Sequence, residues 1–433
     1  MKKQVIGAAL AAALAAGGCT PAQAAGGIPA AGLMSGSAAL LTAAVTAADT
    51  LGAPSAPPAQ AVKKMGLLAV ERTVRENSPT IQSLNKIATG VGSGSIPQAD
   101  VNTIQSTINA YQGLVDGLKD ARGSDEDSAI YIAYTEQIKV MEANIASLQT
   151  SLMTSAITGS ATQTAYDDAE YSLRKQADNV TKQLCSGAES MLIGIQSLDY
   201  MREDLVRNLD ALDRTLTVME VQAERGMISP LELENAQNQR TQLAANLATL
   251  DNQREALGTN LALLCGYSAD TTVEPSNLPE VSATELRSMK YEDDLEAALK
   301  NSYTLWVKKD AVRAAANNRD KNVSGTIETY EAAVKERDAA EEELTLAFKQ
   351  AYDAVSSKKR LLDAAQFAVQ KAEADLEVSQ VKYEIGTVSK LDYQQAQDTL
   401  DAANNAVRSA KLDLLTAYRT YVWAKEGLIT TSA

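Results

Sequence analysis

Neighbouring acidic side chains are the first candidates for chemistry, because paired carboxylates can bind metal ions or serve as general acid and base. They occur at 167–168, 293–294 and 341–343. We expect each group to lie on a helix, where adjacent side chains point in different directions, and interpret all three as solvated helix faces. No histidine is present in the 433 residues, which excludes a histidine-dependent triad and the usual zinc ligand sets. The chain is therefore predicted not to be an enzyme, with no catalytic residue, metal site or cofactor.

One short pattern occurs twice, 160 residues apart, and each copy predicts the bend of a helical hairpin. A glycine is followed three residues later by a serine and three further on by an acid: Gly226, Ser229 and Glu232 in the first copy, Gly386, Ser389 and Asp392 in the second. Glycine adopts the left-handed conformation that ends many helices, and serine with the acid forms a capping box that starts the next helix. The two bends predict two long hairpins.

Apolar residues recur every seven positions on both sides of each bend, as in a coiled coil. In the first half they are Ala177, Leu184, Met191, Leu198, Leu205, Leu212 and Met219, then Ala236, Leu243, Leu250, Leu257 and Leu264. In the second half they are Phe348, Val355, Leu362, Val369, Leu376 and Tyr383, then Leu400, Val407, Leu414, Tyr421 and Leu428. An arm from 165 to 223 would reach roughly 90 Å. The predicted fold is all-α, with long antiparallel coiled-coil hairpins in two repeats and little or no β structure.

The two halves open alike, and a helix is expected at 67–87 and again at 291–317. We assign 62–283 to a first helical repeat and 284–433 to a second. The first repeat has the longer stretch before its bend, and this excess predicts an inserted helical pair. The pair has helical apolar spacing at 104–117 and at 130–153.

The N-terminus is predicted to be an export signal. Residues 1–24 combine a basic start, a short apolar run and a small-x-small cleavage site, as in a signal peptide. The following stretch, 25–61, is rich in Ala, Gly and Pro and is predicted to be a flexible tether. The alternative to cleavage after Ala24 is lipidation of Cys19, because Gly17-Gly18-Cys19 has the form of a lipoprotein junction.

Composition narrows the class of protein. The formal charge is −15, from 55 acidic and 40 basic residues, which excludes nucleic acid as a partner. Only 2 Phe and 2 Trp are present, which favours helices packed side by side over a compact aromatic core. Cys185 and Cys265 would be offset by about 9 Å along an antiparallel hairpin, farther than a disulfide allows. We predict that both are free, partly buried thiols.

The paired bends on heptad arms in an exported chain resemble the TolC-like outer-membrane efflux proteins, over about residues 62 to 428. The resemblance implies a homotrimer whose helical hairpins form an export conduit in the cell envelope and outer membrane, with a periplasmic adaptor and an inner-membrane pump as partners. It implies that the hairpin tips dock the adaptor through Gly226, Ser229, Leu231, Gly386, Ser389 and Leu391. It also implies that Asp392 narrows the tunnel entrance, although Gln395 replaces a second acid.

One feature of that family is missing from the sequence. Family members insert two membrane strands per repeat, and no stretch here has the alternating pattern and aromatic girdles of such strands. The alternative function is therefore a structural or tethering coiled-coil protein of the envelope that conducts nothing, anchored by a lipid on Cys19. Membrane association follows from either reading.

Overall fold

The computed structural model describes residues 61–92, 98–122, 163–268, 270–320 and 323–429, together with single positions between 135 and 149. The signal peptide predicted at 1–24, the lipidation candidate Cys19 and the tether up to residue 60 lie outside the described residues. Residues 60–433 form one compact unit, and the description below concerns that unit alone.

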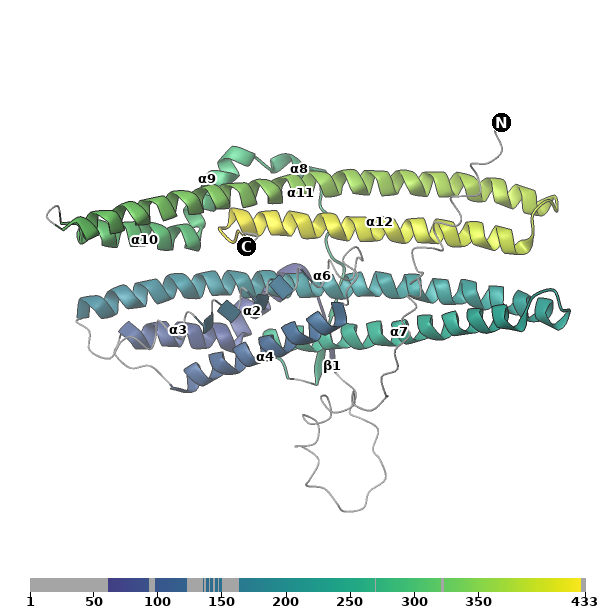
Figure 1. Ribbon diagram of the computed structural model, residues 1–433, viewed down its shortest axis with the longest axis horizontal. Helices are drawn as coiled ribbons and strands as arrows, with labels where there is room; N and C mark the ends of the chain where they lie inside the picture. The colour runs from purple at the N-terminus through teal and green to yellow at the C-terminus, as the bar shows by residue number, and fades with distance from the viewer. Residues whose placement is uncertain are drawn as a thin grey trace, which may run out of the picture. The chain divides into compact units, whose positions relative to one another are not determined.

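The described helices follow each other as two repeats (Figure 1). The first contains α2 (Leu67–Asn77), α3 (Pro79–Gly92), α4 (Gln98–Arg122), α6 (Gln163–Glu224) and α7 (Pro230–Leu264). The second contains α8 (Ala283–Ser288), α9 (Tyr291–Asn301), α10 (Tyr303–Asn317), α11 (Ser324–Glu384) and α12 (Lys390–Lys425). Two strands, β1 (Ala61–Met65) and β2 (Thr271–Pro275), complete the described elements. The predicted all-α fold of two hairpin repeats is confirmed.

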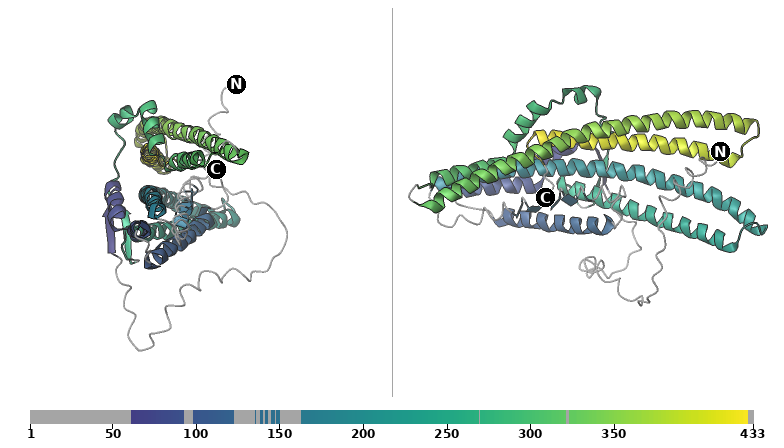
Figure 2. Two further views of the ribbon diagram at one scale, coloured as in Figure 1. Left: turned by 90° about the vertical axis from the view of Figure 1, so that its left-hand side faces the viewer. Right: turned by 45° about the horizontal axis from the view of Figure 1, so that its top comes forward.

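The four long helices lie in one layer in the order α11, α12, α6, α7 (Figure 1). Helices α6 and α7 form the first hairpin, α11 and α12 form the second, and α12 packs against α6 where the two repeats meet. Figure 2 shows the two hairpins one above the other when viewed from the end. Helices α7 and α11 therefore form the two edges of the layer.

The seven-residue rows form the buried seams of the hairpins. The buried members in the first hairpin are Ala177, Leu184, Met191, Leu198, Ala236, Leu250, Leu257 and Leu264. In the second hairpin Phe348, Val355, Leu362, Leu414 and Tyr421 are buried. Toward the bends the same rows become half-buried, as at Leu205, Leu212 and Met219, because only one partner helix covers them there.

Each opening helix is broken in two, which corrects the single helices predicted at 67–87 and 291–317. The break falls at Ser78 in the first repeat and at Ser302 in the second, both with extended backbone. Pro79 disfavours the helical conformation for Ser78, the residue before it. Ser302 instead accepts a hydrogen bond from the N–H of Leu305 and so starts α10.

The return helices end in the same way in both repeats, against these breaks. Gly266 and Gly427 have φ of 79° and 94°, the left-handed region that favours glycine. An added Cβ would lie 2.5 Å from the carbonyl oxygen of Asn77 at Gly266, and 2.3 Å from that of Asn301 at Gly427. Both positions therefore require glycine for conformation and for space.

A short parallel sheet corrects the predicted boundary between tether and helix. Residues 61–65 form β1, which pairs with β2 in parallel register, whereas the sequence predicted a tether to 61 and a helix from about 62. Strand β2 packs on α7 at Gly258, where an added Cβ would lie 2.5 Å from Thr272 Cγ2. Five residues are too few for a reliable strand pattern, and the partner strand lies about 200 residues away.

The inserted pair predicted in the first repeat is helical in its described part. Helix α4 contains the predicted segment 104–117 and buries Ile104, Ile108, Tyr111 and Val115. The described positions between 135 and 149 are also helical, and Ile138, Met141, Ile145 and Leu148 join the same core. The rest of the predicted segment 130–153 lies outside the described residues.

Asp294 is buried, which corrects its interpretation as part of a solvated face. Its carboxylate pairs with Lys425 Nζ at 2.5 Å and accepts hydrogen bonds from the Tyr421 hydroxyl and from the backbone N–H of Lys290. Burial alone would raise the pKa of this carboxyl, but the hydrogen bonds from Lys425 and Tyr421 outweigh it and hold the pKa below its usual value. Asp293, next to it, is exposed as predicted.

Both thiols are free, as predicted, and are fully buried rather than partly buried. Burial raises the pKa of Cys185 and of Cys265 to about 12. Neither thiol is therefore expected to be reactive in the folded protein.

We expect Asp294→Asn to destabilise the protein by about 1–3 kcal/mol at pH 7, because it leaves Lys425 without its buried anionic partner. The lowered pKa means that the stabilisation is present above the ordinary carboxyl pKa and is lost as pH falls through the folded-state value. Urea unfolding from pH 7 to pH 3 should therefore show the difference shrinking toward zero. Asp293→Asn, at the exposed neighbour, is the control and should change little at any pH. A pH-independent loss in Asp294→Asn would contradict the assignment.

Candidate functional site: the two hairpin tips

The first tip, residues 222–232, reverses the chain within a few residues. Gly226 has φ of 68°, and its N–H donates to the carbonyl of Ala223 at 2.9 Å. The N–H of Met227 donates to the carbonyl of Gln222 at 2.8 Å. These two bonds form a Schellman motif, which satisfies carbonyls that the helix end would leave free.

The next helix starts with a capping box. Ser229 Oγ accepts from the N–H of Glu232 at 3.3 Å, and the Glu232 carboxylate accepts from the N–H of Ser229 at 2.8 Å. Pro230 occupies the first helical position, where no N–H is needed. Gly226 and Ser229 thus fill the structural roles predicted for them.

The second tip, residues 382–392, repeats this geometry. Gly386 has φ of 74°, and the N–H of Thr387 donates to the carbonyl of Lys382 at 2.9 Å. Ser389 Oγ accepts from the N–H of Asp392 at 3.1 Å. The Asp392 carboxylate accepts in return from the N–H and the hydroxyl of Ser389, at 3.1 and 2.8 Å. Asp392 therefore serves the capping box, and its role in narrowing a tunnel stays a prediction.

The tips expose apolar side chains that the sequence reading did not all identify. Leu231 is 64% exposed, whereas Leu391, its counterpart, is half-buried. Met227 and Ile385 are each 68% exposed, beside the two tip glycines. The sequence reading missed both because it treated residues next to the glycines as part of the turn. The tip glycines predicted this much, since a side chain next to a left-handed turn has no helix to pack on.

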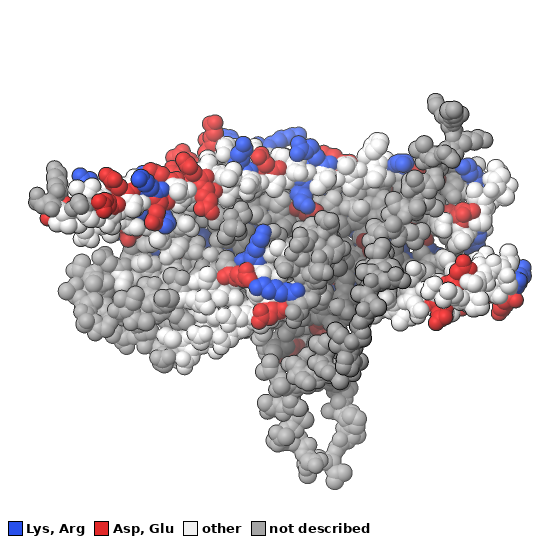
Figure 3. Space-filling model, in the orientation of Figure 1, with Lys and Arg blue, Asp and Glu red and all other residues white. Residues whose placement is uncertain are grey.

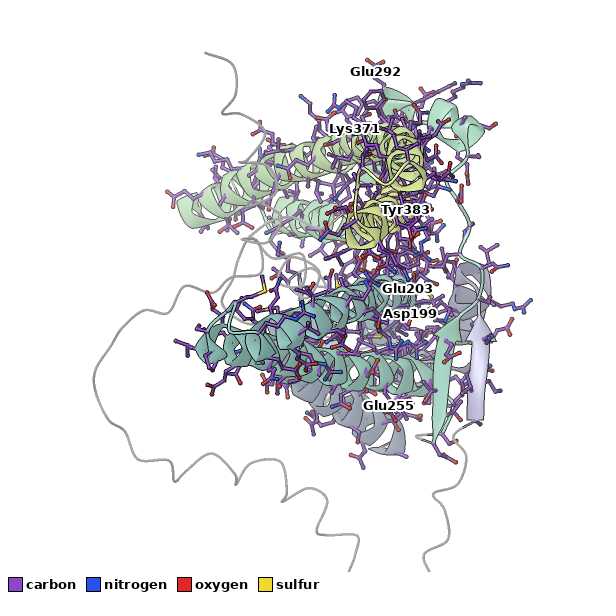
Figure 4. All side chains as sticks on the ribbon, turned by 90° about the vertical axis from the view of Figure 1, so that its right-hand side faces the viewer. Asp199, Glu203, Glu255, Glu292, Lys371 and Tyr383 are labelled. Atoms are coloured by element: carbon purple, nitrogen blue, oxygen red, sulfur yellow. The ribbon has the colours of Figure 1, made fainter. Side chains whose placement is uncertain are left out.

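The two tips differ in aromatic content and in charge. Tyr383 and Tyr393 stack at the second tip with ring centroids 5.2 Å apart, and Figure 4 labels Tyr383 there. The charged residues of the first tip are Glu220, Glu224, Arg225, Glu232 and Glu234, and those of the second are Lys382, Glu384, Lys390 and Asp392. The first tip is therefore acidic and the second is neutral.

An acidic groove lies away from the tips, between α9 and α11. It has a volume of about 570 Å³ and is lined by Tyr291, Asp338, Glu341, Glu342, Thr345, Leu346 and Lys349. Figure 3 shows acidic residues gathered over this part of α11. Within the described ranges no group of three or more acidic or cysteine residues is arranged to hold a metal ion. None of the described helices combines the length and hydropathy that a membrane span requires.

No protein-family model matches the sequence, and no curated protein matches it. Solved structures do match. The outer membrane protein VceC of Vibrio cholerae is 12% identical, with a TM-score of 0.44, over 83% of this chain and 96% of that chain. The CmeC outer membrane channel of Campylobacter jejuni is 14% identical, with a TM-score of 0.41, over 66% of this chain and 69% of that chain.

A third match is the MtrE outer membrane channel of Neisseria gonorrhoeae in its open state. It is 12% identical, with a TM-score of 0.39, over 87% of this chain and 94% of that chain. This chain resembles TolC-like outer-membrane channels. The same resemblance was predicted from the two bends.

We expect Gly226→Ala and Gly386→Ala to destabilise the protein by about 1–2 kcal/mol each, because alanine is strained at positive φ. No other atom lies within 4 Å of an added Cβ at either glycine, so backbone strain is the whole effect. Gly113→Ala is the matched control, since Gly113 is inside α4 with equal space and should gain up to about 1 kcal/mol. Urea unfolding at one protein concentration measures all three. Equal effects in the tip and control variants would contradict the turn assignment.

Proposed function

We propose that this chain is a component of an export or efflux system of the cell envelope. Copies of it would assemble side by side through the edges of the helical layer, so that the hairpins line a conduit. The tips would dock a periplasmic adaptor that connects to an inner-membrane pump. Location at the outer membrane and a trimeric state are part of this proposal.

The observation that carries the proposal is the exposed apolar row on the edge helix α11. Its members are Leu361, Phe367, Val378, Val381 and Ile385, and Phe367 alone is 70% exposed. Burying one such side chain contributes about 1.5–3 kcal/mol. A row of them along one helix edge marks an interaction surface rather than a solvated face.

The opposite edge differs from α11 in a way that suits it as a partner. The side of α7 that faces away from α6 carries exposed small and neutral side chains, Ala244, Ala245, Ala248 and Thr249. Small side chains let the large apolar groups of another helix approach closely. Because the two edges are different surfaces, contact between them is head-to-tail and closes into a ring when the rotation allows it. A ring of such layers would enclose a conduit.

The tips support the docking part of the proposal. Met227, Leu231 and Ile385 stand exposed on short turns that two capping motifs and two left-handed glycines hold rigid. Rigid exposed apolar groups bind a partner with little loss of conformational entropy. We infer that Gly226, Ser229, Gly386 and Ser389 hold these groups in place, while Leu231 and the half-buried Leu391 contribute apolar surface.

Mass photometry of the mature protein should show a trimer at micromolar concentration. Phe367→Asp should shift the population toward monomer, because it places a charge in the proposed contact. Leu68→Asp is the control, since Leu68 is 76% exposed on α2, away from both edges, and should leave the trimer intact. A strictly monomeric parent protein would count against the conduit.

Adaptor docking can be tested in cells with a photo-crosslinking amino acid. Placed at Met227 or Ile385, it should crosslink to a second protein, the adaptor, which mass spectrometry identifies. Placed at Phe367, it should instead crosslink to another copy of this chain. Crosslinks from Met227 and Ile385 that yield only this chain would argue against docking at the tips.

A further inference from the structure

The seam between α6 and α12, where the two repeats meet, changes in character along its length. At the end far from the tips, Glu189 on α6 is only 1% exposed. Its carboxylate accepts from Arg419 Nε at 2.8 Å and Nη2 at 2.5 Å, and from Trp423 Nε1 at 2.8 Å. A buried carboxylate with three donors is fully satisfied, and it ties α12 firmly to α6.

This cluster extends to a third helix. Glu71 on α2 lies 3.8 Å from Arg419 and also pairs with Arg75 at 3.1 Å. The Arg419 guanidinium thus stands between two carboxylates of the first repeat. We call Glu189, Arg419 and Trp423 the pivot cluster. Breaking it would leave a buried charge without a partner, which proteins tolerate poorly.

The middle of the seam is held by weaker contacts. Asn405 on α12 is fully buried and donates to the carbonyl of Tyr200 on α6 at 2.9 Å, while its Oδ1 has no partner. Arg408 pairs with Glu203, and both side chains are nearly half exposed. Figure 4 shows Glu203 on the side of α6 that faces the second repeat.

Closer to the tips the seam is loosely packed. A groove of about 340 Å³ separates the helices, lined by Asp204, Arg207, Asn208, Ala211, Asp398, Ala402 and Ala406. Arg214 pairs with Asp398 across it, with both side chains about a third exposed. The buried Arg214 Nε has no partner. The contacts here are therefore fewer, wetter and less satisfied than at the pivot cluster.

We propose that the α6–α12 seam is a hinge, in which the pivot cluster is the fixed point and the pairs Arg408–Glu203 and Arg214–Asp398 form a latch that opens as ionic strength rises. Salt screens exposed pairs, since the Debye length falls from about 10 Å at 0.1 M to about 3 Å at 1 M. Buried pairs are screened much less. Salt should therefore release the latch and leave the pivot closed.

The length of α6 turns a small tilt into a large displacement of the tip. Glu189 and Gly226 are 37 residues apart, or about 55 Å along the helix. A tilt of about 5° at the pivot would move the tip by about 5 Å. The spacing of the two tips would thus respond to ionic strength.

Spin-label distance measurements within one chain test this hinge. The tip pair is Met227→Cys with Ile385→Cys, and the pivot pair is Asp178→Cys with Thr420→Cys. Cys19→Ser is present throughout, and the buried Cys185 and Cys265 are expected not to label. Labelled chain is diluted into unlabelled chain, so that only distances within a chain are read whatever the oligomeric state. The outcome is therefore independent of self-assembly.

From 50 mM to 1 M NaCl, the mean distance of the tip pair should increase by about 5 Å while that of the pivot pair stays constant. Arg214→Gln with Arg408→Gln should produce the same increase at low salt. Arg240→Gln is the matched control, because Arg240 pairs with Asp213 inside the first hairpin and its loss should not move the tips. If the double variant does not fold, the salt titration of the parent decides.

The pivot is tested separately with Trp423→Phe, which removes one donor to Glu189 and keeps an aromatic ring. It should broaden the distance distribution of the pivot pair at low salt. A tip pair that responds neither to salt nor to the double variant would overturn the hinge. A pivot pair that moves as far as the tip pair, or that Trp423→Phe leaves unchanged, would overturn the assignment of the fixed point.

Discussion

A helix as long as α6, with 62 residues, cannot bury its own apolar row, and the arrangement of the chain follows from how that row is covered. The chain turns back on itself at Gly226, so that α7 covers the row for the whole length of the hairpin. Away from the tips, α2, α3 and α12 add further cover, and there the row is fully buried. Near the tips one helix is the only cover, and the row is half-buried. Stability is therefore concentrated at one end of the hairpins, and exposed surface at the other.

The features that the sequence predicted are local ones. Gly226 with Ser229, and Gly386 with Ser389, act through hydrogen bonds to residues within five positions, so the residue types alone define the turn. The seven-residue rows are likewise repeated local patterns. The docking residues could be placed at the tips for the same reason, although Met227 and Ile385 were missed because exposure beside a turn is decided by the turn's direction.

The features that the sequence did not predict depend on distant partners. Asp294 is buried only because Tyr421 and Lys425 come to it from the end of α12. Strand β1 exists only because β2 lies beside it, and neither strand has a distinctive pattern. The same holds for the seam between the repeats, since nothing near Glu189 in the sequence indicates that Arg419 will reach it. Local patterns defined the hairpins, and contacts between distant segments defined how the hairpins join.

The four left-handed glycines divide into two kinds, and this has a consequence for how the protein can vary. Gly226 and Gly386 have open space where a side chain would go, whereas Gly266 and Gly427 lie against the backbone of Asn77 and Asn301. Asparagine tolerates the left-handed conformation, so the tips could accept it, while the inner positions have no room for any side chain. The inner ends of the hairpins are thus a fixed framework. The tips are free to diverge in sequence, and a surface that can diverge without cost to the fold can be fitted to a new partner.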